Sequence, residues 1–254
     1  MLKICGLGIY QSISDELADR LAGSDVFVER YTSRITDNQI SEIERKLGKK
    51  VREADRGMLE EKAGDFIRNA RDSDVALLVG GDPLIATTHK ILYLEAVRTG
   101  TAIEVVHASS VFTAAIGESG LDFYRFGQVC TIADWKEGYR PISFYDKLSI
   151  NFENRMHTLI LLDYDAQFQR SISHKKAIDI MSAAEAENSR GILAESRELV
   201  MMADIGSDNM KVIYKSMREL REIDIDFGMC CFILHSELSE IEKETLMVMC
   251  GLHA

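Results

Sequence analysis

Three turns of small residues, each following an apolar run, are the part of this sequence best suited to chemistry. They are Gly6-Leu7-Gly8-Ile9, Gly80-Gly81-Asp82-Pro83 and His107-Ala108-Ser109-Ser110-Val111. Glycine lets backbone approach a ligand closely and accepts positive φ angles. Ligands of open parallel sheets bind beyond the carboxyl ends of the strands. We therefore expect the three turns to line one ligand site.

Each turn also has an ordinary explanation. The GxG at Gly6 lacks the third glycine of the dinucleotide fingerprint, and no P-loop motif occurs in the chain. Asp82 is either the N-cap of a helix that starts at Pro83 or a carboxylate that faces a ligand. His89 is more typical of a surface or core histidine than of a catalytic one. No metal site is expected, and the spacing singles out no nucleophile and no general base.

The elements around these turns alternate between strand-like and helix-like segments. Strands are expected at 2–7, 25–31, 75–79 and 102–107, and helices at 14–23, 38–47, 59–71, 83–100 and 110–116. This order predicts a mostly parallel sheet with helices on its faces.

After Gly120 the pattern changes, and a second domain is expected. The predicted strands there are 156–162, 199–203 and 230–234. The predicted helices are 175–188, 212–223 and 238–250, the last burying Ile241, Leu246 and Met249. We place the domains at residues 1–111 and 112–254, although no proline-rich or glycine-rich linker marks the boundary.

Composition narrows the functional class. The 254 residues carry a formal net charge of −11, which argues against binding to nucleic acid or to an anionic membrane. No apolar run approaches 18 residues, and the short N-terminal run predicts a buried strand rather than a signal peptide. Five cysteines form no CxxC pair, so neither disulfides nor a metal site is expected and a reducing cytoplasm fits best.

Longer strings around the turns carry a family resemblance. GGDPLIATTHKILYLEAVRTG resembles the corresponding segment of the diphthine synthase family, which has the tetrapyrrole-methylase fold. The likeness continues through VVHASSVFTAAIGESGLDFYRFGQVCTI, RPISFYDKL and HTLILLDYDA, and it includes the start, ICGLGIYQSIS. About two thirds of the chain matches, with the motifs in the family's order. GGDP occurs across the wider fold, whereas GDPLIATTH with GLDFYRFG is specific.

The resemblance implies two α/β domains, with a mostly parallel sheet in the first and a mixed sheet in the second. It also implies S-adenosylmethionine in a cleft between them, commonly in a homodimer. The implied acceptor is the amino group of a modified histidine on translation elongation factor 2, methylated repeatedly to form diphthine. Carried over by position, the cofactor contacts fall on Ile9, Asp82, Ile85, Ser110, Val111, Ile172, Tyr214 and Ser239.

Some positions depart from the family pattern. Asp204 stands where the family has arginine, Cys230 falls at a family histidine, and Ser239 occupies a histidine position that contacts the cofactor. These departures leave two other hypotheses open. One is a methyltransferase of the same fold acting on a tetrapyrrole, and the other is a noncatalytic cofactor-binding protein.

Overall fold

The computed structural model describes residues 1–252, which form two compact units. The first unit comprises Met1–Val111 together with Ala166–Gln169. The second comprises Phe112–Asp165 and the chain from Arg170 onward. No helix within residues 1–252 combines the length and the apolar character that a membrane crossing requires.

The first unit is a five-stranded sheet with the strand order β3-β2-β4-β1-β5, and every pairing in it is parallel. Its elements are β1 (Leu2–Gly6), α1 (Asp15–Arg20), β2 (Asp25–Val28), α2 (Asp37–Leu47), β3 (Arg52–Glu53), the π-helical turn η1 (Gly57–Glu61), α3 (Ala63–Asp72), β4 (Val75–Val79), α4 (Lys90–Thr99) and β5 (Ile103–Val106).

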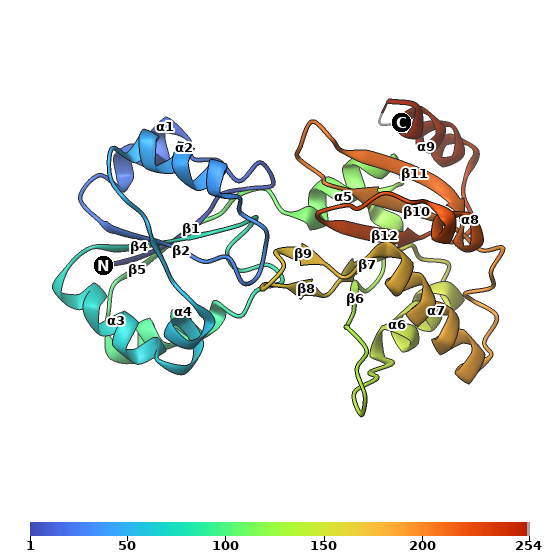
Figure 1. Ribbon diagram of the computed structural model, residues 1–254, viewed down its shortest axis with the longest axis horizontal. Coiled ribbons are helices and arrows are strands. Elements are labelled where there is room, and N and C mark those ends of the chain that lie inside the picture. Colours follow the sequence, from blue (N-terminus) through green and yellow to red (C-terminus); the bar gives the residue numbers. More distant parts are fainter. Residues whose placement is uncertain (253–254) are drawn as a thin grey trace. The chain divides into compact units, whose positions relative to one another are not determined.

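Alternation along the strands builds a core on each face of this sheet. On β4, Leu77 and Val79 pack with Phe66 of α3, whereas Ala76 and Leu78 pack into the other cluster with Leu17, Ile43 and their neighbours. Successive side chains of a strand point to opposite faces. Helices α1 and α2 therefore cover one face, and α3 and α4 cover the other (Figure 1).

The second unit contains a mixed five-stranded sheet with the order β11-β10-β12-β7-β6 and a short antiparallel hairpin, β8-β9. Its elements are α5 (Val111–Ser119), η2 (Phe123–Arg125), β6 (Cys130–Ile132), α6 (Ser143–Glu153), β7 (Thr158–Leu162), β8 (Tyr164–Asp165), β9 (Arg170–Ser171), α7 (His174–Asn188), β10 (Glu198–Ala203), β11 (Lys211–Ser216), α8 (Met217–Glu222), β12 (Cys230–Leu234) and α9 (Glu240–Leu252).

The expected fold class is confirmed, with a parallel sheet in the first unit and a mixed sheet in the second. The expected helix over 212–223 was wrong in its first half. Residues Lys211–Ser216 form β11, which pairs antiparallel with β10, and only Met217–Glu222 are helical. Val212, Ile213 and Tyr214 favour a strand, and Ser216 starts the helix with a capping box to Glu219.

Two further expectations were wrong. The helix expected from Pro83 begins only at Lys90, because residues 83–89 form turns in which Ala86 has a φ of +56°. In α9, Leu246 is buried as expected, but Ile241 is 74% exposed and Glu242 is buried in its stead. That carboxylate is held by a group of polar partners, described below, which a hydrophobic pattern does not reveal.

Candidate active site

The three small-residue turns meet at the carboxyl edge of the first sheet. Gly8 and Gly81 form an antiparallel bridge, with N···O distances of 3.2 Å from Gly8 N to Gly81 O and 3.1 Å in the reverse direction. Ser109 Oγ accepts a hydrogen bond from the Ile9 N–H at 3.0 Å. The turns that follow β1, β4 and β5 are therefore tied to one another.

Glycine is required where these turns approach most closely. A Cβ added to Gly6 would lie 2.5 Å from the Gly81 carbonyl oxygen and 2.7 Å from the Ala108 Cβ. Gly8 has a φ of +67°, and a Cβ there would lie 2.7 Å from Ser109 Oγ. The glycines thus allow backbone from three strands to converge, which leaves peptide groups rather than side chains at the centre of the edge.

Asp82 joins the turn after β4 to the turn after β5. The residue is 6% exposed, and its Oδ1 accepts from the Leu84 N–H at 3.0 Å. Oδ2 accepts from the Ala108 N–H at 3.3 Å and lies 2.8 Å from His107 Nδ1. Because α4 begins at Lys90, Asp82 is not its N-cap, and that explanation was wrong.

The remaining predicted residues of the first unit lie on the same turns. Ile85 is 43% exposed and lies among the turns between Pro83 and His89. Ser110 is buried, and Val111 is the first residue of α5. Ile9, Asp82, Ile85, Ser110 and Val111 are therefore brought to one edge, each beyond the end of β1, β4 or β5.

The structure does not bring the three predicted residues of the second unit together. Because Ala203 pairs with Cys230 and Leu161 with Cys231, the loops after β7 and β10 share one edge of the sheet. Ile172 lies at this edge, where its N–H donates to the Asp163 carbonyl, and its side chain is buried in the core.

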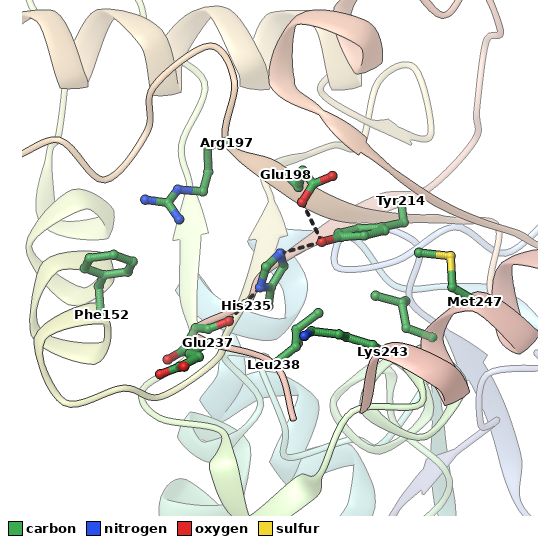
Figure 2. A pocket seen from close by; sticks show the side chains of 11 residues that line it. Phe152, Arg197, Glu198, Tyr214, His235, Glu237, Leu238, Lys243 and Met247 are labelled. Atoms are coloured by element: carbon green, nitrogen blue, oxygen red, sulfur yellow. Dashed lines mark hydrogen bonds between the residues drawn. The ribbon is translucent and has the colours of Figure 1, made fainter. Parts of the chain in front are cut away.

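Tyr214 reaches the opposite edge. Its hydroxyl lies 2.8 Å from Glu198 Oε2 and 3.1 Å from His235 Nε2, at the start of β10 and beyond the end of β12 (Figure 2). Five to six residues of extended strand separate the two edges by about 17 Å. Ile172 and the Tyr214 hydroxyl therefore lie toward opposite edges of the second sheet.

Tyr214 lines a pocket of about 550 Å³ within the second unit. Figure 2 shows the hydrogen-bonded chain Glu198–Tyr214–His235 on one side of the pocket and Leu238, Lys243 and Met247 on another. Burial raises the pKa of Tyr214, and the hydrogen bond to Glu198 raises it further, since a carboxylate beside the phenol opposes its ionisation. Tyr214 therefore stays protonated, and its hydroxyl donates to the Glu198 carboxylate.

Ser239 begins α9 and belongs to a buried polar group, which we call the Glu242 cluster: Glu242, His157, Arg125 and Ser239. The Glu242 carboxylate accepts from the backbone N–H and Oγ of Ser239, both at 2.9 Å, and pairs with Arg125. His157 Nε2 lies 2.9 Å from Glu242 Oε1. The Ser239 hydroxyl is thus engaged in starting a helix, which gives this position a structural role whether or not it contacts a ligand.

The tautomer of His157 follows from its partners. Its Nδ1 accepts from the Ser236 N–H at 3.0 Å, so its Nε2 carries the proton and donates to Glu242. Burial lowers the pKa of His157, which agrees with a neutral ring. Burial alone would raise the pKa of Glu242, but the hydrogen bonds from Ser239 and His157 outweigh it and lower that pKa to about 2.

Asp204, which replaces a family arginine, has a local role in the loops of the Ile172 edge. It has a φ of +48°, and its Oδ1 accepts from the Met229 N–H at 2.9 Å. Cys230 is buried, and burial raises the pKa of its thiol, so it is an inert core residue. Among residues 1–252, no group of three or more His, Cys, Asp or Glu is placed to hold a metal ion.

His107 is the residue of this edge that sequence reasoning passed over as a functional group. An aspartate shortly after one strand and a histidine directly after another are a usable signal only when the strand order is known. Here β4 and β5 both flank β1, so their ends lie within side-chain reach of one another.

Comparison with known proteins identifies the family. Residues 6–221 match the family model described as Tetrapyrrole (Corrin/Porphyrin) Methylases. The chain belongs to this family. A diphthine synthase of Methanothermobacter thermautotrophicus is 34% identical, and the alignment covers 99% of this chain and 96% of that protein. A probable diphthine methyl ester synthase of Arabidopsis thaliana is also 34% identical, over 97% of each chain.

Solved structures agree with these relatives. A putative diphthine synthase from Entamoeba histolytica superposes with a TM-score of 0.87 at 32% identity, covering 98% of both chains. The resemblance to diphthine synthases and the expected methyltransferase class are thereby confirmed.

Proposed function

We propose that this chain transfers methyl groups from S-adenosylmethionine to the amino group of a modified histidine on translation elongation factor 2. The product would be diphthine, an intermediate of diphthamide biosynthesis. The near full-length similarity to diphthine synthases supports this acceptor over a tetrapyrrole. The joined turns beyond β1, β4 and β5 are the observation that carries the donor assignment.

The residues of that edge fit a bulky cationic nucleoside donor. The close approach of the turns at Gly6 and Gly8 means that this edge presents peptide groups rather than bulky side chains to a ligand. Ile9, Ile85 and Val111 offer apolar contact, whereas Ser110 and Asp82 offer polar contact. Bound there, S-adenosylmethionine supplies an activated methyl group on a sulfonium sulfur, so the protein's task is to align donor and acceptor.

In the second unit, we propose Ile172 and its loop edge as the contribution to the donor site. Tyr214 and Ser239 stay predictions from the family resemblance. We further propose a cytoplasmic location and a homodimer.

The decisive experiment incubates the protein with labelled cofactor and elongation factor 2 carrying the unmethylated precursor. We expect label in the elongation factor and cofactor binding by calorimetry, with no label in a precorrin-type tetrapyrrole. Absence of both transfer and binding would contradict the proposal. Cofactor binding without transfer to either acceptor would support the noncatalytic alternative.

A further inference from the structure

The acceptor's amine must lose a proton before it can attack a methyl group, and the first unit contains a group placed to take it. Asp82 Oδ2 lies 2.8 Å from His107 Nδ1. That same oxygen accepts from the Ala108 N–H, and Oδ1 accepts from the Leu84 N–H. An ionised carboxylate can only accept, so His107 Nδ1 must be the donor.

This hydrogen bond fixes the imidazole tautomer. With the hydrogen on Nδ1, the lone pair of neutral His107 is on Nε2. The His107 side chain is 67% exposed, whereas that of Asp82 is only 7% exposed. Asp82 is the residue in the described part of the chain that contacts the ring through a hydrogen bond or ion pair, which leaves Nε2 without a protein partner there. A buried carboxylate that orients an exposed imidazole in this way is a recurrent arrangement for proton transfer.

The pair stands beside the proposed donor site. His107 directly follows β5, in the turn that continues through Ser109 and Ser110, and Ser109 Oγ accepts from the Ile9 N–H. Asp82 follows Gly81, which is bridged to Gly8. The turns after β4 and β5 therefore supply Asp82 and His107, and the turn after β1 is hydrogen-bonded to both of these turns.

We propose that His107 is the general base for the acceptor amine and that Asp82 is its positioning residue. The inference rests on the proposed transfer of methyl groups to an amine. His107 Nε2 takes a proton from the ammonium form of the acceptor, which leaves a neutral amine. The nitrogen lone pair then forms the N–C bond as the C–S bond breaks, and the electron pair of that bond stays on sulfur as a thioether.

The exposed ring then releases its proton to water, and the cycle repeats. Each transfer to a primary, secondary or tertiary amine requires one free lone pair, so one proton is removed before each attack. The third transfer yields a quaternary ammonium, which has no proton left to lose.

His107→Asn is the sharpest variant, because an asparagine Nδ2 can still donate to Asp82 but has no basic nitrogen. We expect its kcat/KM for the precursor-bearing elongation factor to fall about a hundredfold at neutral pH. Cofactor affinity by calorimetry should stay within about twofold, since the turn geometry is preserved. Added imidazole should restore part of the activity of His107→Ala, where the space of the ring is vacated.

The pH profile separates a base from a structural residue. The pH dependence of kcat/KM should differ between wild type and His107→Asn, because only the wild-type side chain can take up a proton in the reaction. Asp82 is the titratable group that contacts the ring, and the nearest charged pair on β5 is Arg20–Glu104. Glu104→Gln on the same strand is the matched control, expected to keep the wild-type rate and profile.

Full activity in His107→Asn would overturn the inference, because the variant keeps the bridge and lacks the base. A loss of activity that merely follows a loss of cofactor affinity would also overturn it, by making His107 structural. Neither result touches the proposed function, which fails only if the wild-type protein itself transfers no label.

Discussion

At the scale of single residues, the site depends on glycines, whose lack of a side chain lets the turns approach one another, as much as on residues with functional groups. The Gly6 position is surrounded by backbone and by Ala108, with no room for a methyl group. At Gly23, by contrast, a Cβ would meet nothing within 4 Å, and this glycine ends no strand of the sheet. A glycine is therefore sterically required at position 6 but not at position 23, so an alanine at position 23 is a control for an alanine at position 6.

We expect Gly6→Ala to lower the free energy of unfolding by about 1–3 kcal/mol, because the new methyl group must push apart the turns at Gly81 and Ala108. Cofactor affinity should fall with it, since the same turns form the proposed donor site. Gly23→Ala should change the stability by less than about 1 kcal/mol. Urea unfolding and calorimetry measure both, and equal effects of the two variants would contradict the packing argument.

Asp82→Ala tests the other side of this edge. Its carboxylate accepts three hydrogen bonds from the chain, so removal should destabilise the protein by about 1–3 kcal/mol. If the remaining acceptor capacity faces the donor, cofactor affinity should fall as well. Reduced stability with unchanged cofactor affinity would show that Asp82 has a structural role and does not contact the cofactor.

At the scale of elements, the sequence specified the first unit more completely than the second. The starts of α1 at Ser14 and α2 at Thr36, and the end of α2 at Gly48, follow local capping rules and lie within two residues of expectation. The strand Lys211–Ser216 was not predicted from the local sequence. It forms by pairing with β10, and the local sequence pattern does not show which strand pairs with it.

The site shows the same division. The turns of the parallel sheet were predictable because the ends of its strands meet at one edge whatever their order. Among the antiparallel strands of the second sheet, strand ends alternate between edges, so the positions of Ile172 and Tyr214 depend on register. The Asp82–His107 contact depends on strand order, which a single sequence does not give.

Tyr214→Phe tests which edge of the second sheet serves the donor. We expect unchanged cofactor affinity, because the hydroxyl points into the pocket of Figure 2, away from the Ile172 edge. Stability should fall by about 1 kcal/mol, since the hydrogen bond to Glu198 is lost. Cofactor binding weakened by about tenfold, measured by calorimetry, would instead support the contact that the family resemblance implies.

The Glu242 cluster predicts how stability depends on pH. The pKa of Glu242 is lowered from 4.5 to about 2 in the folded protein, so its contribution is full above pH 4.5 and is lost as pH falls toward 2. The lowered pKa of His157 acts in the same direction and begins near pH 6.5, where the unfolded ring takes up a proton.

Glu242→Gln should therefore flatten the fall in stability between pH 4.5 and 2, and lower stability at neutral pH by about 1.5–3 kcal/mol because Arg125 and Ser239 lose a charged partner. Glu240→Gln, at an exposed position of the same helix, is the control and should keep the wild-type slope. Urea titrations across this pH range measure both, and parallel curves for Glu242→Gln and wild type would contradict the assignment.

At the scale of the whole molecule, ligand binding should be visible as stability. A donor that binds only the folded protein adds about 2.7 kcal/mol at a concentration of about 100 times its Kd. We expect S-adenosylmethionine and its demethylated product to raise the unfolding midpoint in a concentration-dependent way. No shift for either compound, at concentrations that saturate calorimetric binding, would show that binding does not distinguish folded from unfolded chain.

The composition of the first unit also limits how the molecule can be divided. Four of its residues, Ala166–Gln169, come from the later half of the chain, and Gln169 Oε1 accepts from the Arg30 guanidinium at 2.6 Å. A fragment that ends at Val111 lacks this contact, and its complement carries a hairpin tip without its partner. An exchange of halves between relatives at Val111 would therefore separate Ala166–Gln169 from the unit they belong to, so a chimaera should carry these four residues from the same parent as the first unit.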